Sequence, residues 1–191
     1  MEYSLTLAAI KKFDPCEDSF LRLAKILPKN RKITAQQARY LGCTYDDIIW
    51  IASAVAEDDL EIKKRLTAYV NDNAKAVLHI FEAAEPKDNR VRECIQATDD
   101  FLDGKISEEA WARATRATWA TWAAWAARAA RAARDVWDAG DAFRDWQFDR
   151  LIYWLSDKNP SPLPMPEKGV PALPEIEAIR VAALKKMESG S

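Results

Sequence analysis

The sequence predicts an all-α protein, a multi-helix bundle around one long, kinked amphipathic helix, with a Pro-rich linker and a short C-terminal helix behind it. Helix-capping signals recur along the 191 residues, each a Ser, Thr or Asp that precedes apolar residues at helical spacing. No segment shows the alternation of apolar and polar residues that is typical of a half-buried strand. We therefore expect helices throughout and no strand.

The N-terminal part begins with two predicted helices. Leu5–Phe13 has helical apolar spacing and forms the first. Asp14, Pro15 and Glu17 suit the N-cap, first and third positions of a second helix. That helix is expected to end at Pro28, because proline cannot continue a helix.

Two capping boxes predict the next pair of helices. Thr34 and Thr44 open them, and Gly42 suits the position just after the first of the two helices. The second helix is expected to bury its apolar residues around Trp50. Those residues are Ile48, Ile49, Ile51 and Ala52.

Longer helices are predicted between residues 58 and 103. The first begins at Asp58 or Asp59, and its apolar pattern resumes in a second part at 73–84. Residues 85–88 contain Pro86 and form a turn, and 89–102 returns to helical spacing.

The central helix extends from Ser107, a suitable N-cap, to Leu155. Between Ala110 and Arg134, 13 of 25 residues are alanine, the best helix former. Apolar residues share one side of the helix, and charged residues share the other. The apolar stripe holds Trp111, Trp119, Trp122, Trp125, Val136, Phe143, Leu151 and Trp154, and the opposite face changes from Arg113, Arg116, Arg131 and Arg134 to Asp135, Asp138, Asp141, Asp145 and Asp149.

The length and charge order of this segment predict a kink or break. A helix of about 45 residues would extend roughly 68 Å, whereas a compact domain of this size is about 42 Å across. Arginines before aspartates also oppose a single helix macrodipole. We expect the break between Asp135 and Asp141, where Gly140 could loosen the helix.

The predicted organisation is one helical domain with an appendage. The domain covers 1–156, with short helices in 1–57 and long helices in 58–156. Residues 157–173 form a Pro-rich linker, and 174–188 form a helix that either folds back or docks as a tethered segment.

Bulk properties exclude several classes of protein. A net charge of −2 is not typical of a nucleic-acid binder, and no apolar run reaches the roughly 20 residues of a membrane span. Three cysteines without a CxxC pair, and no secretory signal, predict a cytoplasmic protein.

The sequence offers little for catalysis or cofactor binding. His79 has no cysteine partners for a zinc site and is expected to pack between helices, and no phosphate-binding loop or nucleophile elbow is present. We predict no enzyme activity, no cofactor and no metal. Carboxylate pairs could do acid–base chemistry, but at helix starts and on exposed faces they more often act as caps and solvated groups. They are Asp46/Asp47, Asp58/Asp59 and Asp99/Asp100.

The Trp/Arg/Ala helix fits a core helix best, with Trp119 and Trp122 buried. A membrane-surface helix is an alternative, while nucleic-acid stacking would need aromatic and basic residues on the same face. The acidic ladder, defined as Asp138, Asp141, Asp145 and Asp149, is either a solvated face or a surface for a basic protein partner.

Residues 74–155 resemble a family of immunity proteins of bacterial polymorphic toxin systems that also occurs in phage-type genomes. The resemblance is carried by Leu78–Glu82, Pro86, Asp88–Arg92, Ile95, Gly104–Ile106, Trp111, and the alanine-rich helix as far as Gln147 and Leu151. It implies an all-helical protein that binds and neutralises a toxin. The resemblance implies no particular binding residues.

The charged residues around the 85–88 turn also have a structural interpretation. Glu82 can pair with Arg90 or Arg92 across the turn and hold a helical hairpin together, or the arginines could contact a partner.

The sequence therefore favours a non-enzymatic inhibitor that neutralises a bacterial toxin or defence effector by direct binding to a protein partner, without nucleic acid or membrane. The alternative is a helical scaffold that forms homo-oligomers through its C-terminal helix. An enzyme with an unrecognised carboxylate site ranks third.

Overall fold

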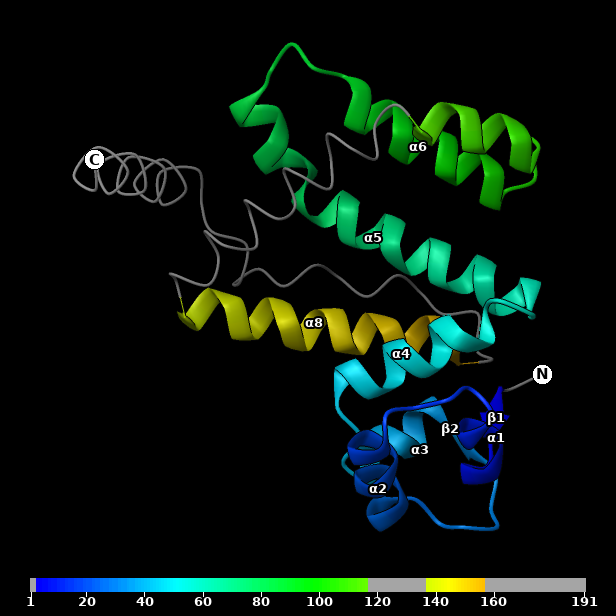
Figure 1. Cartoon of the computed structure of the whole chain (residues 1–191). Coiled ribbons are helices and arrows are strands. Elements are labelled where there is room, and N and C mark those ends of the chain that lie inside the picture. The colour runs from blue at the N-terminus through cyan, green and yellow to red at the C-terminus, as the bar shows by residue number, and fades with distance from the viewer. Residues whose placement is uncertain (1–2, 117–136, 157–191) are drawn as a thin grey trace, which may run out of the picture. The chain divides into compact units, whose positions relative to one another are not determined.

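The computed structural model describes residues 3–116 and 137–156, apart from the side chains of residues 80, 83, 84 and 137–143 (Figure 1). These residues divide into two units. One joins 3–69 to 148–156, and the other joins 70–116 to 137–147, so that α5 (Leu60–Ala84) and α8 (Trp137–Leu155) each contribute to both.

Several predictions on the C-terminal half fall outside the described residues. They concern Trp119 and Trp122, the linker at 157–173 and the helix at 174–188. Gly140 lies inside α8, which is continuous from Trp137, and the rest of the region expected to kink is not described.

A two-stranded sheet corrects the expectation of no strands. β1 (Ser4–Leu5) pairs antiparallel with β2 (Ile33–Thr34), with Ser4 opposite Thr34 and Leu5 opposite Ile33. Two residues per strand are too few for alternation to appear in a sequence. The described chain is otherwise mainly helical, as predicted.

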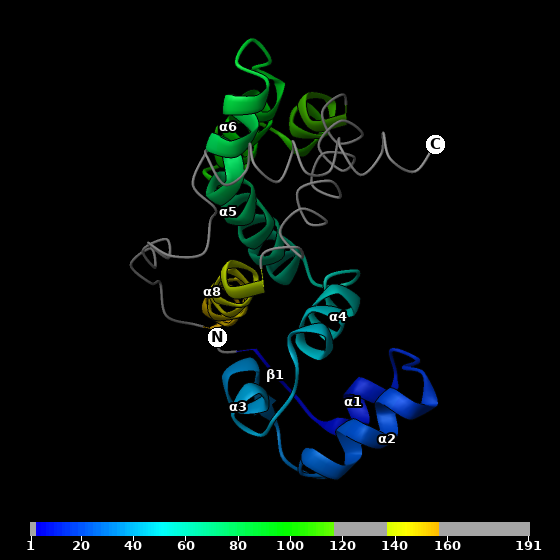
Figure 2. The ribbon, with the colours of Figure 1, turned by 90° about the vertical axis from the view of Figure 1, so that its left-hand side faces the viewer.

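The first two helices begin later than the sequence predicts. α1 (Leu7–Lys11) starts after Thr6, whose hydroxyl accepts the Ala9 amide at 3.1 Å. α2 (Glu17–Ile26) starts after Cys16. Asp14 is not its N-cap, because Asp14 has a φ of 53° and lies in the turn between the two helices. Figure 2 shows α1 next to α2, with which it packs.

The next two helices confirm both predicted capping boxes. Thr34 caps α3 (Ala35–Tyr40), and Thr44 caps α4 (Tyr45–Val55). Gly42 lies between them at a φ of 103°, and the Gly42 and Cys43 amides donate to carbonyls in the last turn of α3. This is a Schellman turn, which needs a residue that tolerates positive φ.

The first unit has one apolar core drawn from both of its chain segments. Leu151, Ile152 and Leu155 of α8 are buried together with residues from every other element of the unit except β1 and α3. The latter residues are Leu7, Ile10, Leu23, Leu27, Ile33, Ile48, Ala52, Val55, Ile62 and Tyr69, with Cys43 from the turn before α4.

The second unit is built from helices that follow one another along the chain. α5 is one continuous helix, although the sequence suggested two parts. The turn at 85–88 then leads to α6 (Arg90–Leu102), and residues 108–116 are helical after the Ser107 cap. Figure 1 shows α6 beside the helical residues 108–116. Ala74, Phe81, Val91 and Ile95 form the core between α5 and α6.

Candidate functional site

The acidic ladder lies on α8, but its described members differ in their surroundings. Asp138 and Asp141 lie in the part of α8 whose side chains are not described. Asp145 is exposed. Asp149 is 53% exposed at its side chain and accepts a hydrogen bond from the guanidinium of Arg39 on α3. Asp149 therefore already has a cationic partner inside the fold.

An aromatic network surrounds this ion pair. The Arg39 guanidinium lies 4.3 Å from the centre of the Phe148 ring, and that ring meets Tyr45 edge to face at 6.0 Å. The Tyr45 and Tyr69 hydroxyls lie 2.8 Å apart. The network links α3, α4, α5 and α8 within the first unit, so Arg39 and Asp149 have a structural explanation.

Asp47 is a buried carboxylate whose oxygens accept hydrogen bonds from Thr44 and Arg22. It is 6% exposed and accepts hydrogen bonds from the Thr44 amide and hydroxyl at 2.8 Å each and from Arg22 at 2.7 Å. Burial alone would raise the pKa of Asp47, but the bonds from Arg22 and Thr44 hold the pKa below its ordinary value. Asp47 is thus ionised and caps the start of α4. Its lowered pKa makes it a weak base, and its oxygens already accept hydrogen bonds, so it does not suit general-base chemistry at neutral pH.

Members of the other carboxylate pairs are also engaged in holding helices. Asp59 accepts the Glu61 and Ile62 amides at 3.0 and 3.1 Å and caps α5. Asp99 accepts bonds from Asn71 at 2.8 Å and from Lys75 at 2.6 Å. The side-chain amide of Asn71 donates to Asp99 on α6 and does not compete for the backbone of its own helix. This fits the continuity of α5 at this point.

An ion pair joins α5 and α6 across the turn at 85–88. Arg92 pairs with Glu82 across the turn, whereas Arg90 bonds Asp88 at 2.6 and 2.9 Å. The bonds with Arg90 lower the pKa of Asp88 to about 2. His79, expected to pack between helices, is exposed on α5.

Trp111 joins the helical residues 108–116 to α6. Its indole N–H donates to the Thr98 hydroxyl at 3.0 Å, and its ring stacks on Phe101 with centroids 4.8 Å apart. The Thr98 hydroxyl in turn donates to the Cys94 carbonyl at 2.8 Å. Buried indole N–H groups usually need such an acceptor, so this contact fixes the position of the helix.

The outward side of α4 is the feature that the sequence prediction missed. Trp50 was expected among buried residues but is 38% exposed, and Asp46 and Ser53 on the same side are exposed as well. Glu57, in the turn after α4, is also exposed. The apolar residues around Trp50 suggested burial on all sides, whereas a helical wheel separates Trp50 from the buried Ile48 by about 160°.

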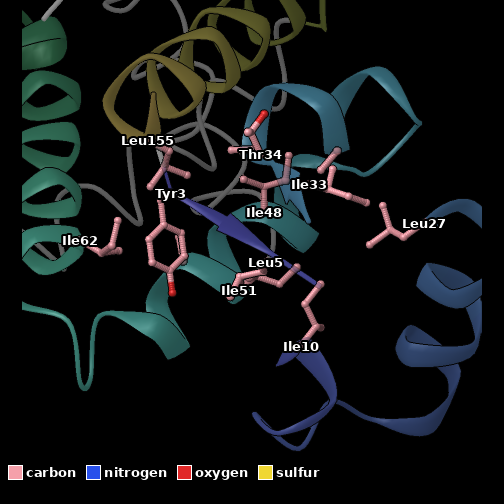
Figure 3. A pocket seen from close by; sticks show the side chains of 13 residues that line it. Tyr3, Leu5, Ile10, Leu27, Ile33, Thr34, Ile48, Ile51, Ile62 and Leu155 are labelled. Carbon is pink, nitrogen blue, oxygen red and sulfur yellow. The ribbon is translucent and has the colours of Figure 1, made fainter. Parts of the chain in front are cut away.

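One apolar cavity lies in the first unit (Figure 3). Its volume is about 60 Å³, and Ile48 and Ile51 of α4 point into it beside Leu5 and Leu155. Pockets for small molecules usually measure about 300–1,000 Å³. This cavity is too small for such a ligand.

The described side chains give little support to metal or thiol chemistry. Within 3–116 and 137–156, no group of three or more His, Cys, Asp or Glu side chains is placed to hold a metal ion. Cys16, Cys43 and Cys94 are free thiols, and burial raises the pKa of Cys43 to about 11. In the same residues, no helix combines the length and hydrophobicity of a membrane span.

The fold places this chain among proteins made mainly of α-helices. Within that class, residues 59–121 match the family described as Imm-5 like putative immunity protein. The match covers α5, α6 and the helical residues 108–116, and it confirms the resemblance seen in the sequence as far as residue 121. It starts earlier than the predicted span and does not include 122–155. No curated protein and no solved structure matches the chain.

Proposed function

We propose that this chain is an immunity-type or phage-type inhibitor that neutralises a bacterial toxin or defence effector by direct binding, without catalysis. The observation that carries the proposal is the match of residues 59–121 to an immunity family. The engaged carboxylates Asp47, Asp59 and Asp99 and the small cavity agree with it, because an enzyme needs free groups around a site of substrate size.

The proposed partner is a protein with a basic surface, met in the cytoplasm. Asp145 is exposed on α8, and Asp138 and Asp141 precede it at helical spacing. Like charges at this spacing repel by a few tenths of a kcal/mol per pair, which a basic partner would relieve. Because Asp149 already pairs with Arg39, the first three residues carry this part of the proposal.

The test is neutralisation of a toxin in living cells. The toxic protein encoded beside the gene is expressed with and without this chain, and growth is measured. We expect the chain to restore growth and to copurify with the toxin. Failure of the folded chain to do either with any neighbouring toxic protein would contradict the proposal.

A second experiment tests the ladder. Asp141→Lys with Asp145→Lys should slow association several-fold at low salt and flatten its salt dependence, because long-range attraction steers charged partners. The matched control is Glu108→Lys with Glu109→Lys in the second unit. An unchanged rate and salt dependence would show that the ladder is a solvated face.

A further inference from the structure

We propose that the α4 outward face is a docking surface for a cationic segment of a protein partner. This face is defined as Asp46, Trp50 and Ser53 of α4 together with Glu57 in the following turn. The proposal rests on the proposed function for the partner being a protein. The chemistry of the contact rests on α4 itself.

The two sides of α4 have different environments. Ile48, Ala52 and Val55 are buried, and Figure 3 shows Ile48 and Ile51 pointing into the core cavity. At 100° per residue, Asp46, Trp50 and Ser53 fall within about 60° of one another on the opposite side. All three are exposed, Trp50 to 38%, so part of the Trp50 side chain meets solvent between Asp46 and Ser53.

The two carboxylates of this face take no part in the ion pairs of the described residues. Within residues 3–116 and 137–156, neither Asp46 nor Glu57 forms an ion pair. By contrast, three other carboxylates of the first unit pair within the fold. They are Asp47 with Arg22, Asp149 with Arg39, and Glu61 with Arg65. The last turn of α4 also contains no basic residue. Among the described residues, nothing neutralises the negative charge on this face, which leaves it for the cation that we propose.

The chemistry of the face fits arginine or lysine. An indole ring is the aromatic group that attracts cations most strongly over its face. Asp46 lies four residues before Trp50, which is about 6 Å along the helix axis, so a guanidinium over the ring could also reach this carboxylate. A phosphate backbone would meet the same carboxylates as like charges, and this disfavours nucleic acid.

Contacts on the buried side and at the start of α4 fix the conformation of this face. The Thr44 capping box and the Arg22–Asp47 ion pair fix the first turn of α4, and the Gly42 turn fixes its connection to α3. A docking residue on a fixed helix loses little conformational freedom on binding. Exposed tryptophans in such positions are the residues that most often dominate protein interfaces.

The probe for this surface is a nona-arginine peptide titrated into the full, isotope-labelled chain. Its binding is followed by the NMR signals of the backbone amides and the indole N–H groups. We expect the Trp50 indole, identified with Trp50→Phe, and the amides of 45–57 to shift. Trp50→Ala should weaken binding about fivefold. Asp46→Asn with Glu57→Gln should weaken it by a similar factor and reduce the salt dependence.

Controls test whether the peptide binds this surface, or binds any acidic segment or any exposed aromatic residue. Tyr40 is an aromatic residue that is 90% exposed, but its neighbour Arg39 is basic and would repel a cationic peptide. Tyr40→Ala should therefore leave binding unchanged. Far-ultraviolet circular dichroism of each variant checks the fold. Equal affinity of wild type and Trp50→Ala, shifts confined to other acidic segments, or equal binding of nona-glutamate or a single-stranded oligonucleotide would overturn the proposal.

The same variant distinguishes this surface from the function itself. If wild type neutralises a toxin and Trp50→Ala does so equally well at limiting expression, the α4 outward face is not the docking surface. If the wild type neutralises none, the proposed function fails, and the peptide titration still decides whether the face receives cations.

Discussion

Arg39 binds Asp149, 110 residues further along the chain, while its guanidinium covers the Phe148 ring at 4.3 Å. Asp149, a residue of the predicted acidic ladder, therefore helps to hold α8 against α3. Half-exposed ion pairs contribute little alone, about 0.2–1 kcal/mol, so the stacking on Phe148 adds much of the value of this contact.

Removing Arg39 should lower the free energy of unfolding more than removing the charge of Asp149. Asp149→Asn should lower the free energy of unfolding by at most about 1 kcal/mol, whereas Arg39→Ala should cost more because it also removes the stacking on Phe148. Urea denaturation of both variants and the double variant measures their coupling. If Arg39→Ala costs no more than Asp149→Asn, the ring contact adds nothing.

Asp47→Asn should destabilise the first unit by about 1.5–3 kcal/mol at neutral pH, because it weakens charge-assisted bonds to Arg22 and Thr44. The effect should depend on pH. The pKa of Asp47 is lower in the fold than in the unfolded chain, where it is about 3.9, so its ionised form stabilises the fold above that pH. The stability gap between wild type and variant should therefore shrink as the pH falls from about 5 towards 3. A gap that stays constant over this range would contradict the assignment.

Two substitutions on α4 should lower the stability to different extents. Ile48→Ala enlarges the core cavity and should cost about 2–5 kcal/mol. Trp50→Ala should cost less than this, because Trp50 is 38% exposed whereas Ile48 is 4% exposed. Thermal and urea unfolding compare them directly. A loss in Trp50→Ala as large as that in Ile48→Ala would place the indole in the core and remove it from the proposed docking surface.

Trp111 should stabilise the second unit through both its ring and its N–H group. Trp111→Phe keeps an aromatic ring against Phe101 but loses the bond to Thr98, and should cost about 1 kcal/mol. Trp111→Ala should cost more, because it removes the ring as well. Equal losses in the two variants would show that the stacking contributes nothing measurable.

Local signals in the sequence predicted the helices well. The capping boxes at Thr34 and Thr44 and the turn at 85–88 depend on residues three or four positions apart, so a sequence displays them directly. The β1–β2 pairing could not be predicted in this way, because it joins residues far apart in short strands. Asp14 fitted a helix start by residue type, yet its backbone conformation belongs to a turn.

The candidate site was harder to predict than the helices. Whether a carboxylate is open to a partner depends on a distant cation, as with Arg39 for Asp149 and Arg22 for Asp47. Trp50 was missed for a related reason, since a tryptophan among isoleucines suggests burial. The line of Asp46, Ser53 and Glu57 on its side of the helix was the signal available in the sequence.

The core of the first unit contains Leu7 and Leu23 together with Leu151 and Leu155, and this sets an order of events during synthesis. Residues 70–147 must leave the ribosome before α8 can reach the N-terminal residues that it covers, which takes about 4–16 s at usual elongation rates. Until then, apolar residues of 3–69 remain uncovered, while the second unit can already close the contacts between α5 and α6. The first unit therefore completes its core only after α8 has been made, and a chain that stops before residue 148 leaves this core open to aggregation and proteolysis.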